Sequence, residues 1–198
     1  VPFILKISGI VVLVISLLIG LFWLISSESN NKKEITNVAF HDIKNKVVII
    51  NSNQSSGTGF LLEIDNKVYL ISNEHVLRSS ETPIAQLING EELQLGEFSV
   101  ASDGRDIARF EVLNYNGEMF QLDNEIPDIN DEVVVYGNSL GGGVATELKG
   151  KIVGVGPRVL EIDNEIVPGN SGSPIISTNG KVLGIASYLS PEGFSNEW

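Results

Sequence analysis

The stretch Pro168–Pro174 reads Pro-Gly-Asn-Ser-Gly-Ser-Pro and places one serine, Ser171, between two nearby glycines, Gly169 and Gly172. Glycine adopts backbone conformations that other residues avoid, so the stretch predicts a sharp turn that leaves the serine hydroxyl accessible. Alone, such a stretch is typical of a glycine-rich hairpin turn. A serine hydroxyl is a weak nucleophile until a neighbouring base takes its proton. A chemical role for Ser171 therefore requires a histidine and a carboxylate from elsewhere in the chain.

His75 and Asp106 are the candidate partners of Ser171. A strand-like run ends in polar residues just before His75, and Asp106 directly precedes the apolar run 107–113. The order His, Asp, Ser is weak evidence by itself. Each residue nevertheless lies at the edge of a predicted strand, where a rigidly held side chain can reach a cleft. Asp103 is the rival carboxylate, but its Ser-Asp-Gly context indicates a turn, which favours Asp106.

The composition excludes several classes of function. The 198 residues include 25 acidic and 13 basic side chains, a formal net charge of -12, which argues against a nucleic-acid partner. Cysteine is absent, so the chain holds no disulfide and no thiolate metal site. The two histidines are His75 and His41, and His41 is interpreted as solvated or structural. We therefore predict neither a metal nor a cofactor.

The amino-terminal part of the chain predicts a membrane anchor. Ile7–Ile25 carries no charge, and as a helix rising about 1.5 Å per residue it would cross roughly 28 Å of hydrocarbon. A cleaved secretory signal has a shorter apolar region followed by small residues, so an anchor over residues 1–26 is the preferred interpretation. Residues 27–37 are polar and predict a flexible tether. A helix that starts inside would place residues 38–198 on the extracytoplasmic side of a single-pass membrane protein.

The remaining sequence predicts an all-β fold. No long segment repeats with the 3.6-residue period of a helix, and short β-branched runs alternate with turn residues. The polar stretch 122–131, which contains Pro127, predicts a crossing between two six-stranded antiparallel halves, packed as a sandwich or as barrels. The halves are expected at about 38–121 and about 132–198. The predicted strands are 46–50, 59–64, 67–71, 83–88, 91–96, 107–113, 132–136, 146–155, 158–162, 175–176 and 182–188.

Two short connections predict hairpins. Asp65-Asn66 is one, and Asn179-Gly180 is the stronger, because this pair tolerates the positive φ angles of a type I′ turn. The glycine-rich segment Tyr136–Gly143 lacks the lysine and the following helix of a phosphate-binding loop, so we interpret it as a turn between strands.

Taken together, six motifs resemble the trypsin-like (chymotrypsin-fold) serine proteases, and within them the disulfide-free HtrA/Deg branch. The resemblance covers roughly residues 45–190 and implies two six-stranded β-barrels with the active site between them. His75 and Asp106 would come from the first barrel and Ser171 from the second. The motifs are Gly57-Thr58-Gly59-Phe60, Ile71-Ser72-Asn73-Glu74-His75-Val76, Asp106-Ile107-Ala108, Tyr136-Gly137-Asn138-Ser139-Leu140-Gly141, Gly169-Asn170-Ser171-Gly172-Ser173-Pro174 and Gly180-Lys181-Val182-Leu183-Gly184-Ile185.

The resemblance also implies a role for each site residue. Ser171 would attack the scissile carbonyl of a protein or peptide substrate, with His75 as general base and Asp106 as its orienting carboxylate. The backbone N–H groups of Gly169 and Ser171 would form the oxyanion hole.

The substrate-binding residues implied by the resemblance leave specificity open. Glu165 occupies the position where some relatives carry an acidic residue at the base of the specificity pocket, which would favour Lys or Arg at the cleavage point. Leu189 would narrow that pocket, and HtrA-type relatives prefer small or medium apolar side chains, so we interpret Glu165 as solvated. An edge strand that pairs with the substrate backbone is expected at Ile185, Ala186 and Ser187.

Several expectations concern the whole protein. The leading hypothesis is a membrane-anchored endopeptidase in protein quality control or processing, and the alternative is a catalytically inactive binding or scaffold protein of the same fold. The family often forms homo-oligomers and continues into a closing helix and a PDZ domain. This sequence ends at Trp198 without that helix, so we expect a truncated or minimal form with an incomplete second barrel.

Overall fold

A computed structural model describes residues 43, 45–53, 56–78, 82–113, 115–187 and 195–197. They all belong to one compact unit, Ala39–Trp198. The predicted membrane anchor and tether lie outside the described residues. Within the described ranges, no helix has the length and apolar character needed to cross a membrane.

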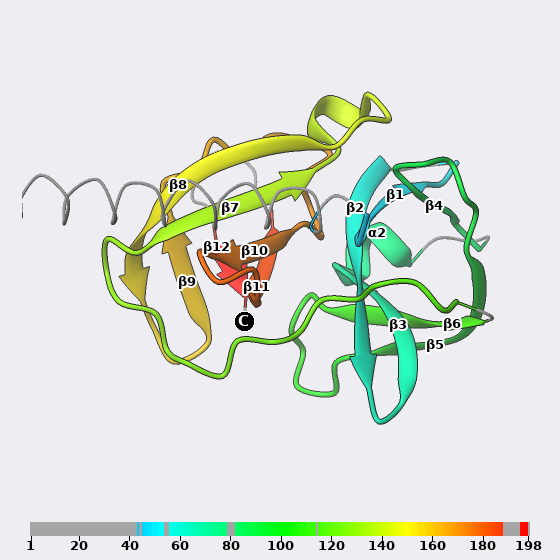
Figure 1. The fold of residues 1–198 in the computed structure, drawn as a ribbon, viewed down its shortest axis with the longest axis horizontal. Coiled ribbons are helices and arrows are strands. Elements are labelled where there is room, and N and C mark those ends of the chain that lie inside the picture. Colours follow the sequence, from blue (N-terminus) through cyan, green and yellow to red (C-terminus); the bar gives the residue numbers. More distant parts are fainter. Residues whose placement is uncertain are drawn as a thin grey trace, which may run out of the picture. The chain divides into compact units, whose positions relative to one another are not determined.

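The described chain folds into two antiparallel β-sheets of six strands each. Figure 1 shows the two sheets. The first sheet has the order β4-β1-β2-β3-β6-β5 and the second is a closed barrel with the order β10-β11-β12-β9-β8-β7. The all-β prediction and the six strands expected in each half are therefore confirmed, whereas a closed barrel is found for the second half and the first half is a barrel-like six-stranded sheet. The first sheet contains β1 (Val47–Asn51), β2 (Ser56–Ile64), β3 (Lys67–Ser72), β4 (Ile84–Leu87), β5 (Gln94–Val100) and β6 (Ala108–Leu113). The second contains β7 (Glu132–Gly137), β8 (Thr146–Val155), β9 (Val159–Ile162), β10 (Pro174–Ser177), β11 (Val182–Ser187) and β12 (Ser195–Glu197).

The two predicted hairpins form, but their turns differ. Asp65 and Asn66 both have positive φ, 51° and 60°, as a type I′ turn between β2 and β3 requires. In the Asn179-Gly180 turn between β10 and β11 only Gly180 has positive φ, so the predicted type I′ geometry is wrong there. The Asn179 side chain instead accepts hydrogen bonds from the Ser177 hydroxyl and from the Lys181 N–H. These local bonds stabilise a different turn.

An apolar interface joins the two sheets. One buried cluster lies within the first sheet and another within the second, while a third combines residues of both. In this shared cluster Phe60 of β2 packs edge-on against Phe120, with ring centroids 6.0 Å apart, and Tyr136 of β7 and Ile185 of β11 belong to the same cluster. Burial of these side chains against one another fixes the position of one sheet on the other.

The second barrel is closed, contrary to the expectation that it would be incomplete. Strand β12 pairs with β11 on one side, for example Ala186 with Asn196, and with β9 on the other. Its three residues carry no β-branched side chain, which is why no strand was predicted there. Pairing with two neighbouring strands, rather than intrinsic propensity, accounts for this element.

Candidate active site

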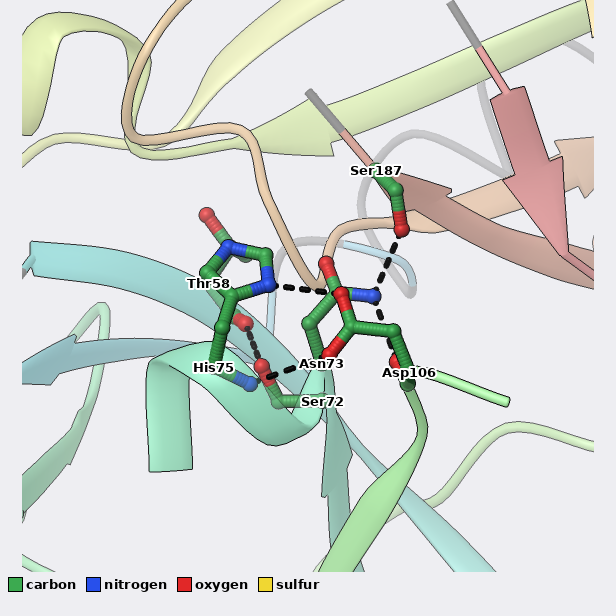
Figure 2. Close-up of polar contacts among 6 residues, drawn as sticks. All are labelled: Thr58, Ser72, Asn73, His75, Asp106 and Ser187. Atoms are coloured by element: carbon green, nitrogen blue, oxygen red, sulfur yellow. Dashed lines mark hydrogen bonds and ion pairs between the residues drawn. The ribbon is translucent and has the colours of Figure 1, made fainter. Parts of the chain in front are cut away.

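His75 and Asp106 meet at the edge of the first sheet. His75 lies in α2 (Glu74–Leu77), a single helical turn that follows β3 directly, and Asp106 lies just before β6. Strands β3 and β6 are paired, with Ser72 opposite Ala108, and this pairing brings His75 and Asp106 together. The Asp106 carboxylate contacts His75 twice, through Oδ2 to Nδ1 at 2.6 Å and through Oδ1 to the backbone N–H at 3.0 Å (Figure 2).

The electrostatics of this pair fix the role of each imidazole nitrogen. Partial burial would raise the pKa of Asp106, but the hydrogen bonds from the His75 ring and backbone, with the His75 charge, outweigh it and lower that pKa below its ordinary value. The carboxylate is therefore ionised at neutral pH and can only accept hydrogen bonds. The proton of the neutral imidazole then resides on Nδ1, which leaves Nε2 as the basic nitrogen. The His75 side chain is 49% exposed, so solvent or a substrate can reach the imidazole.

Asp103 does not take part in this pair. Its carboxylate binds the Nε of Arg105 at 2.9 Å and lies 3.6 Å from a guanidinium nitrogen of Arg158. The hydrogen bond from Arg105 lowers the pKa of Asp103. Of the two candidate carboxylates, Asp106 is the one that contacts the histidine, as predicted.

The turn Pro168–Pro174, named the serine turn below, packs directly on β2 and on the end of β3, the strand that leads to His75. The Thr58 N–H donates to the Ser171 carbonyl at 2.9 Å, and a Cβ added to Gly172 would collide with the Ser72 hydroxyl and the Thr58 carbonyl. A Cβ added to Gly57 would lie 2.6 Å from Val76 and 3.2 Å from the Ser171 carbonyl oxygen. Ser171 itself is 7% exposed. The turn and the histidine-bearing helix thus flank the same glycine of β2.

Two N–H groups of this turn have a defined direction. The Pro168 carbonyl accepts a hydrogen bond from the Leu140 N–H at 2.7 Å, and the Asn170 carbonyl accepts one from the Ser173 N–H at 3.0 Å. In a trans peptide the N–H points opposite to the C=O, and the described chain has no cis peptide bond. The N–H groups of Gly169 and Ser171 therefore point away from these donors. Gly169 has φ of +94°, which a residue with a side chain would adopt only under strain.

Comparison with known proteins identifies the family of this fold and site. Residues 57–185 match the model of the trypsin-like peptidase domain. The chain belongs to the trypsin-like peptidase family. It is 31% identical over 156 residues to a protein of Brucella suis biovar 1 named "Probable periplasmic serine endoprotease DegP-like". A protein of the same name from Pseudomonas putida strain W619 is 32% identical over 146 residues.

These alignments cover most of this chain but a minor part of the relatives. They span 71% and 69% of this chain, and 29% of each relative. Among solved structures, the serine endoprotease from Yersinia pestis superposes with a TM-score of 0.65 at 27% identity, covering 81% of this chain and 61% of that one. The active form of the Rv3671c protease from M. tuberculosis superposes with a TM-score of 0.69 at 21% identity, covering 82% and 79%, and this likeness concerns the fold.

The predicted substrate-binding residues of this trypsin-like domain fall into different environments. The Glu165 side chain is exposed, in agreement with its interpretation as solvated. Ile185 and Ala186 are buried, and β11 is paired there on both sides. On one side the Ala186 N–H donates to the Ser173 carbonyl and the Ala186 carbonyl accepts from the Gly172 N–H, and on the other side β11 pairs with β12. Ser187 also pairs with Ser195 of β12, so the free edge expected at Ile185, Ala186 and Ser187 is absent. Leu189 lies outside the described residues.

Ser187 and Asn73 form a contact that the sequence did not predict. The Asn73 amide donates to the Ser187 hydroxyl at 2.7 Å and to the Asp106 carbonyl at 2.8 Å. Asn73 and Ser187 are both buried, and Figure 2 shows the amide between the strand that carries Ser187 and the Asp106 loop. The polar end of the otherwise apolar β3 was the available signal, but its partners lie on distant segments. Asn73 thus links the loop that carries Asp106 to the second barrel.

Among the described residues, no group of three His, Asp or Glu side chains converges as a metal site would require.

Proposed function

We propose that this chain is a membrane-anchored serine endopeptidase that hydrolyses peptide bonds through His75, Asp106 and Ser171. The observation that carries the proposal is the 2.6 Å contact between His75 Nδ1 and Asp106 Oδ2, in a domain whose serine turn is hydrogen-bonded to β2 beside the histidine helix. The family match and the relatives named as serine endoproteases support it.

The reaction follows from the protonation states of the pair. With its proton on Nδ1 held by Asp106, the His75 imidazole offers Nε2 to the Ser171 hydroxyl and takes its proton as Oγ attacks the substrate carbonyl. The ionised carboxylate then stabilises the imidazolium. The imidazolium returns the proton to the leaving amine, and an acyl-enzyme remains. Water, activated by the same histidine, hydrolyses the ester and restores the serine.

The oxyanion of the tetrahedral intermediate would be bound by the backbone N–H groups of Gly169 and Ser171. Their direction, away from the donors that hold the Pro168 and Asn170 carbonyls, supports this role. Removing one such donor typically costs about 3 kcal/mol of transition-state stabilisation.

Hydrolysis of casein by the folded domain tests the proposal. Wild-type residues 38–198 should release acid-soluble peptides, and Ser171→Ala should reduce the rate at least about a thousandfold without loss of β-structure in circular dichroism. Equal activity of the two proteins would point to a contaminating protease. A folded wild-type domain without Ser171-dependent hydrolysis would favour the alternative, a catalytically inactive binding or scaffold protein.

For specificity we propose cleavage after small or medium apolar residues. The exposed side chain of Glu165 supports this, because an acidic specificity pocket requires a carboxylate directed into the pocket. A peptide library should show weak cleavage after Lys or Arg and no change in Glu165→Ala. Strong cleavage after Lys or Arg that disappears in Glu165→Ala would contradict the assignment.

For location we propose that the apolar segment Ile7–Ile25 anchors the protease domain on the extracytoplasmic side, as the word periplasmic in the relatives' names also suggests. The full chain should sediment with membranes. A protease added to cells whose cytoplasmic membrane is intact and whose outer layers have been made permeable should digest residues 38–198. Protection of the domain until the inner membrane is disrupted would reverse the orientation.

A further inference from the structure

One buried side chain of the first sheet, Thr58 of β2, is hydrogen-bonded to the serine turn of the second barrel. Its side chain has no exposed surface. Thr58 Oγ1 donates to the Gly169 carbonyl at 2.8 Å, across 111 residues of sequence, and accepts from the Asn138 N–H at 2.8 Å, across 80 residues. A hydroxyl has a single proton. Because a lone pair of the hydroxyl oxygen accepts from the Asn138 N–H, the hydroxyl proton is left to donate to the Gly169 carbonyl, and the two bonds together fix the direction of the O–H bond.

Each of the four carbonyls from Pro168 to Ser171 has its own donor. The Pro168, Asn170 and Ser171 carbonyls accept from the backbone N–H groups of Leu140, Ser173 and Thr58, and the Gly169 carbonyl accepts from the Thr58 hydroxyl. The hydroxyl is the one side-chain donor of this set. It acts on the peptide that directly follows the Gly169 N–H, the first oxyanion donor.

The same hydroxyl also acts indirectly, through Asn138, on the Pro168–Gly169 peptide, which contains this N–H. Asn138 begins the turn that contains the 3-10 helix η1 (Ser139–Gly141), and Leu140 of that turn holds the Pro168 carbonyl. A Cβ added to Gly169 would collide with the Asn138 carbonyl, so the two turns pack in direct contact. Through Asn138, Thr58 therefore supports the second bond that fixes the Gly169 N–H.

Such support matters because glycine resists rotation less than any other residue. A rotation of the Pro168–Gly169 peptide would direct a carbonyl, instead of an N–H, toward the developing oxyanion. An oxyanion hole stabilises the transition state only if its donors are oriented before the reaction. The side chain of Thr58 supplies part of that orientation from the first sheet.

We propose that the Thr58 hydroxyl is a positioning group of the oxyanion hole, a role that rests on the proposed peptidase function. It touches no reacting atom and acts through Gly169 and the Asn138–Gly141 turn. The main chain of the same residue binds the Ser171 carbonyl and accepts from the Ser72 hydroxyl at 2.6 Å (Figure 2). Substitution of the side chain leaves these backbone bonds in place.

The test compares Thr58→Val, which keeps the shape and removes the hydroxyl, with Thr58→Ser, which keeps the hydroxyl. Rates on a peptide substrate are expressed per active site, titrated by exhaustive fluorophosphonate labelling. Thr58→Val should lower kcat about 10- to 100-fold with KM within about twofold, and Thr58→Ser should restore kcat to within about threefold of wild type. Ser177→Ala is the control, because its hydroxyl bonds Asp123 in a hairpin that the mechanism does not use, and its kcat should equal that of wild type.

A second readout separates orientation from stability. A peptide aldehyde forms a hemiacetal with Ser171 and uses the oxyanion hole, so its inhibition constant should rise in Thr58→Val by the same factor as kcat/KM falls. The matching peptide alcohol cannot form this adduct and should bind wild type and variant equally.

Failure of the positioning role and failure of the proposed peptidase function would give different results. Wild-type kcat and aldehyde affinity in folded Thr58→Val would overturn the positioning role and leave the peptidase function intact. Unfolding of both Thr58→Val and Thr58→Ala, under conditions in which Thr58→Ser folds, would also overturn it, because the hydroxyl would then be a requirement of the fold. A folded wild-type protein without Ser171-dependent turnover would overturn the proposed function itself.

Discussion

At the residue scale, the Asp106 carboxylate orients His75 through both its ring and its backbone. Asp106→Asn should lower kcat by about 10⁴, because an amide can donate to Nδ1 and so stabilise the wrong tautomer. Steady-state hydrolysis of a peptide substrate measures this effect. Asp103→Asn, which removes a neighbouring carboxylate bonded to Arg105, should stay within about threefold of wild type. Comparable losses in both variants would contradict the assignment of Asp106.

The lowered pKa of Asp106 also predicts how stability depends on pH. A carboxyl group with a folded-state pKa below its ordinary value of 3.8 stabilises the fold above that value and loses this contribution as the pH falls further. Urea unfolding of wild type and of Asp106→Asn should therefore differ by a constant free energy near neutral pH. Below about pH 4 the unfolding free energy of wild type should fall relative to that of Asp106→Asn. A difference independent of pH down to about pH 2.5 would contradict this.

The chain's sequence predicted the His75 and Asp106 pair but not the hydrogen bonds of the Thr58 hydroxyl to the second barrel. The predicted pair is in contact in the structure, because the family resemblance fixed both positions within recognisable motifs, and the catalytic roles of the two residues stay predictions. Thr58 lies in such a motif too, yet its partners Asn138 and Gly169 are 80 and 111 residues away. Only the packing of the two sheets brings a hydroxyl of β2 to that turn.

At the scale of elements, the serine turn requires a glycine at position 172 for two separate reasons, its positive φ of +86° and the lack of room for a Cβ. Gly180, in the turn between β10 and β11, has a similar φ of +81° but open space around it, so it isolates the first reason. Gly180→Ala should cost about 1–2 kcal/mol in unfolding free energy for its backbone conformation alone. Gly172→Ala adds the collision with Ser72 and should cost about 2–5 kcal/mol. Equal losses in urea unfolding would show that crowding at Gly172 is negligible.

Strands with β-branched runs were predicted within a few residues, for example β8 over Thr146–Val155. The strand predicted at 91–96 begins three residues before β5, because Glu92 forms only an isolated bridge with Gln86 and the continuous strand is Gln94–Val100. Its burial pattern is largely exposed, so apolar periodicity gave little guidance. β12 was missed because its pairing is set by β9 and β11 rather than by its own sequence.

At the scale of the whole molecule, the cluster shared by both sheets should make the two barrels unfold together. Phe60 is 1% exposed in this cluster, and Phe60→Ala should lower the unfolding free energy by about 3–5 kcal/mol in a single transition. Phe98→Ala, at a partly exposed site against Phe110, is the control and should cost less. Hydrogen exchange of β3 and β9 amides should follow the same urea dependence. Separate transitions for these strands would show that the barrels are independent units.

The most direct measurement of the central claim is covalent labelling of the domain with a fluorophosphonate, followed by peptide mass spectrometry. We expect one modified residue, Ser171, with labelling abolished in Ser171→Ala and slowed about 10³-fold or more in His75→Ala, because the nucleophile then lacks its base. Labelling of folded wild-type protein at another residue, or no labelling at all, would contradict the account.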